Sequence, residues 1–230
     1  MNILRNIVGL LLLPWAWALS RTVLSLLAGL PEPSNGLLSS AAVALGGGYL
    51  LWLLIFYTLP RPARAYVLGH ELTHALWGVL LGSKVSRIKV GSDSGFVELS
   101  KTNFIITLAP YFFPFYTMIL IVLYGCLGLF CDVRPYQFAW LAAVGFTWGF
   151  HFTFTLVTLF QHQTDIQSVG HLFAWSIIYC FNVLGIAVWI VVVSPASWGQ
   201  LVDALLLHTR DAYGACLTAA LQAWSAWRTK

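Results

Sequence analysis

Six apolar stretches, separated by polar or turn-forming segments, occupy most of this chain. They cover residues 7–30, 37–59, 63–81, 104–130, 138–160 and 171–193. A helix needs about 20 apolar residues to cross the roughly 30 Å of hydrocarbon in a bilayer, and each stretch is long enough to do so. We therefore expect an all-α polytopic membrane protein with about six transmembrane helices.

The charge content excludes an ordinary soluble globule. The chain has 12 Lys+Arg and 8 Asp+Glu among 230 residues, which makes 9% of them charged, whereas a soluble domain carries charge on about a quarter of its residues. The net charge of +4 is scattered, with no basic cluster interleaved with aromatic residues, so no nucleic-acid partner is expected. The lipid bilayer is the expected surrounding, and the compactness of the chain favours the inner membrane of a bacterium.

One polar segment, residues 83–102, differs from the rest of the chain. Apolar residues alternate there with Ser, Arg, Lys and Glu on both sides of the turn sequence at 91–95. This period of two predicts a β-hairpin, and a solvated loop is the alternative. Because a hairpin has open edges, it must lie at the membrane interface or be buried by protein.

The apolar stretches suggest three regions. Residues 1–60 would form two N-terminal transmembrane helices, although residues 16–18 also have the small-x-small form of a signal-peptidase site. Residues 61–194 would form a core that contains the hairpin at 83–102 and four further helices, one before it and three after it. Residues 195–230 mix apolar and polar residues as an amphipathic helix does, which favours a C-terminal tail that lies on the membrane.

The third apolar stretch contains an H-E-x-x-H motif, formed by His70, Glu71 and His74. On a helix, residues four apart share a face and lie about 5–6 Å apart, so both imidazoles can reach one metal ion. Glu71 can then act on a water molecule at that ion as general base. Ionisable groups are costly in an apolar helix and usually have a functional role. The alternative is a hydrogen-bonded polar cluster that ties helices together.

A catalytic zinc site usually has three protein ligands and one open position. Asp165 is the favoured third ligand, because it is the only acidic residue between Asp132 and Asp203. A helix-capping role is its alternative. His151, His162 and His171 are the rival candidates.

This pattern resembles the site-2 protease class of intramembrane zinc metalloproteases. The similarity spans about residues 64–185 and comprises the H-E-x-x-H helix, a hairpin, a Pro-bearing span with Ala109-Pro110 and Pro114, and a late Asp. The resemblance implies that His70, His74 and Asp165 bind one zinc ion, that Glu71 is the catalytic base, and that the hairpin holds an extended substrate. The family usually has Asp-Gly at the late motif, whereas Ile166 follows Asp165 here, so we expect a divergent branch.

The expected function is therefore that of a zinc-dependent intramembrane endopeptidase. Its substrate would be a membrane protein or membrane-anchored peptide, cut in a transmembrane or membrane-proximal segment. One alternative is a non-proteolytic membrane protein, such as a metal carrier or an assembly factor that retains the metal-binding helix. Another is a zinc protease of the prenyl-protein type, in which a Glu is the third ligand. The only Glu after the motif is Glu98, in the expected hairpin.

Overall fold

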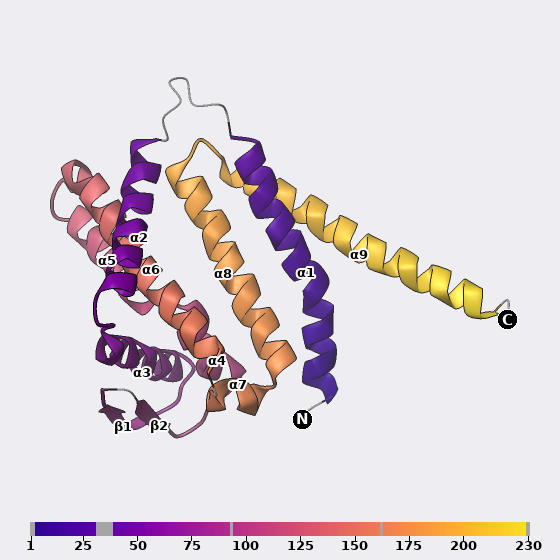
Figure 1. Ribbon diagram of the computed structural model, residues 1–230, viewed down its shortest axis with the longest axis horizontal. Coiled ribbons are helices and arrows are strands. Elements are labelled where there is room, and N and C mark those ends of the chain that lie inside the picture. The colour runs from indigo at the N-terminus through magenta and orange to yellow at the C-terminus, as the bar shows by residue number, and fades with distance from the viewer. Residues whose placement is uncertain (1–2, 31–38, 93, 162, 229–230) are drawn as a thin grey trace. The chain divides into compact units, whose positions relative to one another are not determined.

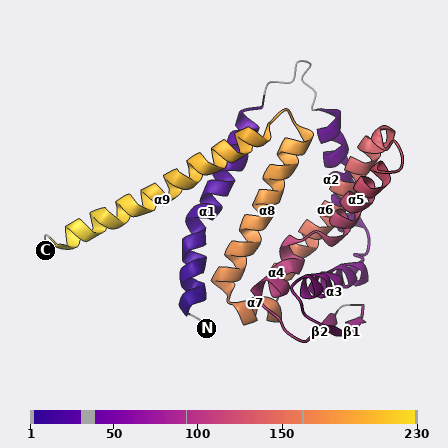
Figure 2. The ribbon, with the colours of Figure 1, turned by 180° about the vertical axis from the view of Figure 1, so that it is seen from behind.

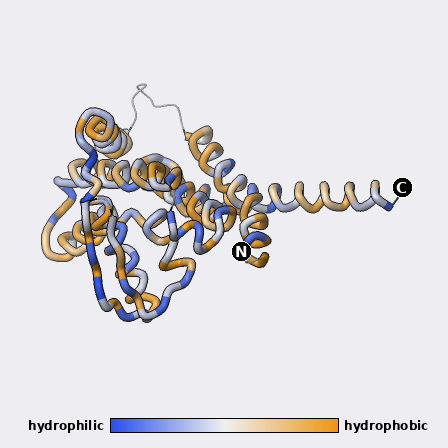
Figure 3. The backbone as a smooth tube through the Cα atoms, turned by 60° about the horizontal axis from the view of Figure 1, so that its bottom comes forward, coloured by the Kyte–Doolittle hydropathy of each residue, from blue (hydrophilic) through white to orange (hydrophobic). Residues whose placement is uncertain are grey.

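The computed structural model describes residues 3–30, 39–92, 94–161 and 163–228. It is mostly helical, with one small sheet (Figure 1). The helices are α1 (Ile3–Ala28), α2 (Ser40–Thr58), α3 (Ala63–Leu80), α4 (Phe104–Phe112), α5 (Phe115–Gly128), the 3-10 turn η1 (Arg134–Tyr136), α6 (Gln137–Leu159), α7 (Thr164–Val169), α8 (His171–Val193) and α9 (Trp198–Arg228). The strands are β1 (Val85–Val90) and β2 (Gly95–Leu99). Hydrophobic residues predominate along most of the helices (Figure 3).

Four helical segments of the described chain are long and apolar enough to cross a membrane. They are α1, α2, the run Arg134–Leu159 that contains α6, and α8. The pair α4 and α5 also qualifies if it is counted as one bent span, which brings the number to five. Helix α3 is not among them, because Arg64 and the three ionisable residues of the H-E-x-x-H motif lower its mean hydropathy. The chain is thus a membrane-helix protein, and the expected count of six spans is not confirmed.

The helices form two compact units, one of α1, α8 and α9 and the other from α2 to α7. In the first unit, α1 runs beside α8 (Figures 1 and 2). The Ser176 hydroxyl donates to the Gly9 carbonyl across this pair, and Tyr213 of α9 donates to the Leu11 carbonyl. The expected C-terminal tail is a single helix, α9.

The second unit is built around the close pair α2 and α6. Gly48 and Gly145 lie where the two backbones meet, and a Cβ atom on either would overlap a carbonyl of the other helix. Small residues allow this close approach. In lipid no hydrophobic effect drives helices together, so such close packing is what favours their association. Beside them, the indole of Trp52 donates to Thr153 at 2.8 Å and packs edge-on against Phe150. Tyr66 of α3 packs against the aromatic side chains of this helix pair and stacks on Phe154.

The predicted hairpin is confirmed. Strands β1 and β2 are antiparallel, with Ile88 opposite Val97 and Val90 opposite Gly95, and the Gly91 amide donates to the Ser94 carbonyl at the turn. Helix α3 leads directly into β1, because Gly82 adopts a positive φ of 74° that ends the helix. The hairpin packs against α3, so its strands belong to the same unit as the motif.

The fourth apolar stretch is broken rather than straight. Helices α4 and α5 are bent by 79°, and the break falls at Phe113 and Pro114. Proline disfavours the helical conformation of the residue before it, and Phe113 is accordingly extended, at φ −103° and ψ 103°. The break leaves α4 as a nine-residue helix that packs against α3 and α7.

Candidate metal centre

The two histidines of the motif lie on one face of α3, as the i, i+4 spacing predicts. Their Nε2 atoms are 3.2 Å apart, and the two rings are nearly perpendicular, with centroids separated by 4.9 Å. Both side chains are largely buried, at 12% and 13% exposure. Helix α3 therefore presents two nitrogen donors to one point in space.

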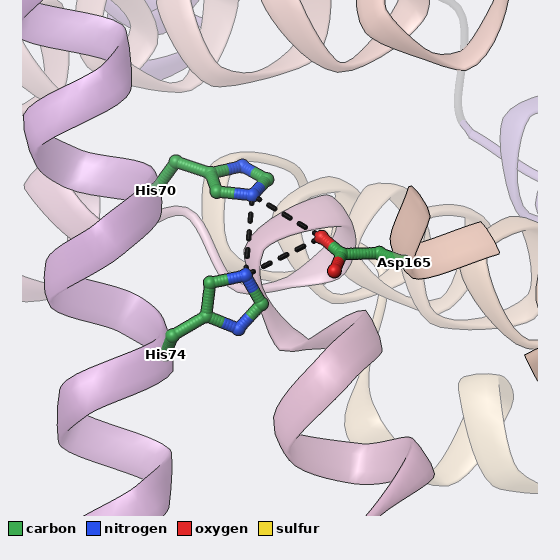
Figure 4. A group of neighbouring side chains, drawn as sticks. All are labelled: His70, His74 and Asp165. Atoms are coloured by element: carbon green, nitrogen blue, oxygen red, sulfur yellow. Dashed lines mark hydrogen bonds and ion pairs between the residues drawn. The ribbon is translucent and has the colours of Figure 1, made fainter. Parts of the chain in front are cut away.

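Asp165 completes this group from the short helix α7, 91 or more residues further along the chain. Its Oδ2 atom lies 3.5 Å from Nε2 of His70 and 3.4 Å from Nε2 of His74 (Figure 4). Among the residues that the structure describes, these are the three whose donor atoms come together in a group that could hold a metal ion. The sequence had predicted the same three.

The spacing of the three atoms fits a small tetrahedral cation. Bonds of about 2.0–2.2 Å from zinc to nitrogen or oxygen put neighbouring ligand atoms of a tetrahedron roughly 3.3–3.6 Å apart. The three separations in this site are 3.2, 3.4 and 3.5 Å. Three electron-rich atoms at these distances repel one another unless a proton or a cation lies between them. The donor set of two imidazoles and one carboxylate suits zinc and other divalent transition metals.

Hydrogen bonds to the far side of each imidazole orient the rings. Nδ1 of His74 lies 2.9 Å from the Ile106 carbonyl oxygen. Because a carbonyl can only accept, Nδ1 carries the hydrogen, and the neutral ring then offers the lone pair of Nε2 to the site. Nδ1 of His70 lies 3.4 Å from the Tyr66 hydroxyl, which also contacts the Thr158 hydroxyl at 3.1 Å.

Asp165 is held ionised. Burial alone would raise the pKa of its carboxyl, but the imidazoles of His70 and His74 beside Oδ2 outweigh burial and hold the pKa below its usual range. The hydroxyl of Tyr111 also donates to Oδ2, at 3.2 Å. Tyr111 was not among the residues expected at the site, although it directly follows Ala109-Pro110, which is part of the resemblance.

Glu71 lies beside the group, in contact with the hairpin. Its side chain is buried, with 7% exposure, and packs so closely on Gly95 that a Cβ atom there would be 2.9 Å from Oε1. A cleft of about 440 Å³ opens next to it. His70, Glu71, Ser94 and Gly95 line this cleft together with apolar and amide side chains of α3, α6 and the segment before α7. The Glu71 carboxylate, one candidate metal ligand and the first residue of β2 thus line one cavity.

The rival ligand candidates have different surroundings. His151 is buried on α6 and lines a small cavity of about 20 Å³ with His70. Its Nε2 has no hydrogen-bond partner among the described residues. His171 is exposed at the start of α8, in the other unit, and His162 lies outside the described residues. Glu98 is exposed on β2 and accepts a hydrogen bond from Ser86.

Comparisons of the chain with protein-family models, with curated proteins and with solved structures found no match. The geometry of this site is therefore what indicates a function for the protein. That geometry comprises three candidate metal ligands, a buried carboxylate beside them and a cleft flanked by a strand.

Proposed function

We propose that this protein is a zinc-dependent intramembrane endopeptidase that cuts a transmembrane or membrane-proximal segment of another protein. The observation that carries this proposal is the meeting of His70, His74 and Asp165 at tetrahedral spacing, with Glu71 on the cleft next to them. His70 and Asp165 are almost a hundred positions apart in the sequence, yet their side chains meet here. The chain has only eight acidic residues, so few of them could have supplied this carboxylate.

Each residue has a defined part in peptide hydrolysis. A zinc ion held by His70, His74 and Asp165 would polarise the scissile carbonyl and lower the pKa of a water molecule to about 7. Glu71 takes a proton from the attacking water and delivers it to the leaving amine. The Tyr66 and Ile106 contacts hold the two imidazoles in place, so that little reorganisation is needed when charge develops.

The hairpin explains how a helical substrate could be attacked. A peptide bond within a helix is shielded by its own hydrogen bonds, whereas an extended segment exposes it. Strand β2 begins at Gly95, directly beside Glu71, and its neighbour Ser94 lines the cleft. A substrate segment that pairs with a hairpin edge would therefore pass the base in extended form.

We further propose that α3 and the bent pair α4 and α5 lie within the bilayer, for a total of six membrane-embedded segments. The support is the packing of α3, which contacts α4, α5 and the hairpin. His70, Glu71 and His74 are accordingly largely buried within the protein, which is where ionisable groups in membranes are tolerated.

The test is Glu71→Gln, which keeps the shape of the side chain but cannot accept the proton. The probe is a labelled single-span peptide of about 30 residues with a Gly-Gly pair in its apolar run, co-reconstituted with the protein in vesicles. Cleavage should fall by about 10²–10⁴-fold, while the purified variant keeps one zinc per chain by elemental analysis.

Glu98→Gln is the matched control, since Glu98 is an exposed acid on the hairpin that packs against α3. It should leave cleavage unchanged. Undiminished, chelator-sensitive cleavage by zinc-loaded Glu71→Gln protein would overturn the role of Glu71. Zinc uptake into vesicles by wild type, without cleavage of the peptide, would favour a metal carrier.

A further inference from the structure

Helix α4 supplies an outer hydrogen-bond partner to two of the three candidate metal ligands. The Ile106 carbonyl accepts from Nδ1 of His74 at 2.9 Å. One and a half turns later, the Tyr111 hydroxyl donates to Oδ2 of Asp165 at 3.2 Å. Ile106 and Tyr111 are almost completely buried, at 1% and 0% exposure, whereas the Asp165 side chain is 25% exposed.

The sequence of α4 explains why the Ile106 carbonyl is available. In an α-helix, the carbonyl of residue i accepts from the amide of residue i+4. Four residues after Ile106 is Pro110, within α4, and proline has no amide hydrogen. The Ile106 carbonyl would therefore be buried without its usual donor, which is unfavourable. His74 provides the missing donor.

We propose that Pro110 and Tyr111 are positioning residues for the metal centre. Pro110 leaves the Ile106 carbonyl free to fix the tautomer of His74, and Tyr111 fixes the carboxylate of Asp165. This inference rests on the metal site in the proposed function but does not depend on the protein cutting peptides.

The tautomer matters because only one form of neutral histidine can bind a metal through Nε2. With its hydrogen on Nδ1, His74 presents a lone pair toward His70 and Asp165. With its hydrogen on Nε2, the same ring would place that hydrogen where the ion must lie. The acceptor at Ile106 selects the competent form before any ion arrives.

The position of the Tyr111 hydroxyl is equally constrained. The ring meets that of His70 edge to face, with centroids 5.3 Å apart and an interplanar angle of 88°. It therefore cannot turn away from Asp165 without losing this contact. Asp165 itself comes from the six-residue helix α7, which is too short to fix a side chain alone. Tyr111 links this short element to α4.

The first test is Pro110→Ala, with metal affinity measured by competition with a chromophoric zinc chelator. The new amide competes with His74 for the Ile106 carbonyl, so zinc affinity should fall by about 10-fold, at the lower end of the range for loss of an outer partner. The melting temperature of the metal-free protein should stay the same or rise, because a proline is removed from a helix interior. If Pro110 served only to stabilise the fold, its replacement would lower the melting temperature together with the zinc affinity.

Two further measurements complete this test. Nitrogen-15 NMR of the histidine rings in metal-free protein, with His74 assigned through a His74→Gln variant, should report the Nδ1–H tautomer in wild type and a mixture in Pro110→Ala. Pro14→Ala is the matched control, since Pro14 lies inside α1 in the other unit; it should change neither zinc affinity nor the His74 signal. Wild-type affinity together with an unchanged tautomer in Pro110→Ala would overturn the role of Pro110.

The second test is Tyr111→Phe, which keeps the ring against His70 and removes only the hydroxyl. Zinc affinity should fall by about 10–100-fold, with the melting temperature of metal-free protein little changed. Tyr124→Phe is the control, because the Tyr124 hydroxyl donates to the Val133 carbonyl at the far end of α5. Unchanged affinity in Tyr111→Phe would overturn the role of Tyr111. Because no substrate enters these experiments, their outcome is separate from that of the cleavage assay.

Discussion

Gly95 of the hairpin lies against the side chain of Glu71, the candidate base. A Cβ atom at position 95 would lie 2.7 Å from Cγ of Glu71 and 2.8 Å from the Lys89 carbonyl oxygen. Contacts this short force one partner to move. Glycine at this position therefore sets how near the strand can approach the carboxylate.

Gly95→Ala should consequently impair the proposed peptide cleavage without loss of metal. The methyl group would push the hairpin away from Glu71, and a displacement of about 1 Å in a catalytic site can cost about 10²-fold in rate. Cleavage and zinc content of the variant are the measurements. Gly46→Ala is the control, because a Cβ atom at Gly46 meets nothing within 4 Å. Wild-type cleavage by Gly95→Ala would show that this contact does not position Glu71.

His151 provides a second prediction at the residue scale, because its buried Nε2 finds no partner in the described part of the chain. An unpaired buried polar atom typically costs about 1–3 kcal/mol. We expect His151→Leu to leave zinc content at one per chain and to keep or raise the melting temperature. Asp165→Ala should instead lose zinc. If His151→Leu loses zinc while Asp165→Ala keeps it, the third ligand has been assigned to the wrong residue.

The sequence predicted the group of candidate metal donors better than the groups that support them, for a physical reason. His70 and His74 carry the i, i+4 signature of a shared helix face, and Asp165 stood out because acids are so scarce. The acceptor for His74 is a backbone carbonyl, which has no residue signature of its own. Pro110 is the one sequence sign that the Ile106 carbonyl lacks its helical donor, because proline has no amide hydrogen. That His74 lies next to this carbonyl becomes known only from the fold.

At the scale of the helices, the pair α2 and α6 depends on two glycines where the backbones touch. A side chain at Gly145 would overlap the Leu45 carbonyl, so the helices could not keep their spacing. Gly145→Val should therefore destabilise the unit by at least the roughly 1–3 kcal/mol typical of overpacking. Thermal unfolding in detergent measures this loss. Gly185→Ala on α8 should be tolerated, since a Cβ atom at Gly185 would meet no atom within 4 Å. Equal stability of both variants would contradict the close packing of α2 on α6.

Apolar run length predicted the positions of the long apolar helices but not the form of every one. The stretch 104–130 is long enough for a straight span, yet Pro114 breaks it into α4 and α5. The hairpin was predictable because a period of two is distinct from helical periodicity. The alternative of a solvated loop was wrong. Helix α3 was predicted as a span by its flanking leucines and valines, whereas the face that carries His70, Glu71 and His74 reduces its apolar character.

At the scale of the whole molecule, the candidate metal site belongs entirely to the unit from α2 to α7. Its three ligand residues lie on α3 and α7, and their outer partners on α3 and α4. Helices α1, α8 and α9 contribute no residue to the group among those described. A bound ion would therefore stabilise one unit selectively.

Hydrogen exchange with and without zinc tests this separation. An ion that binds only the folded site adds RT ln(1 + [L]/Kd) to its stability, which is about 2.7 kcal/mol at 100 times Kd. Amides of α3, α4 and α7 that exchange through opening of the site should then exchange about 100-fold more slowly. Those of α1, α8 and α9 should be unaffected. The Asp165→Ala variant should show no zinc effect anywhere, because Asp165 is the only candidate ligand from α7 and its loss leaves two imidazoles on a single helix. Equal protection of both units by zinc in the wild type would mean that the ion acts on the fold as a whole, and the local role assigned here to α4 would then be untenable.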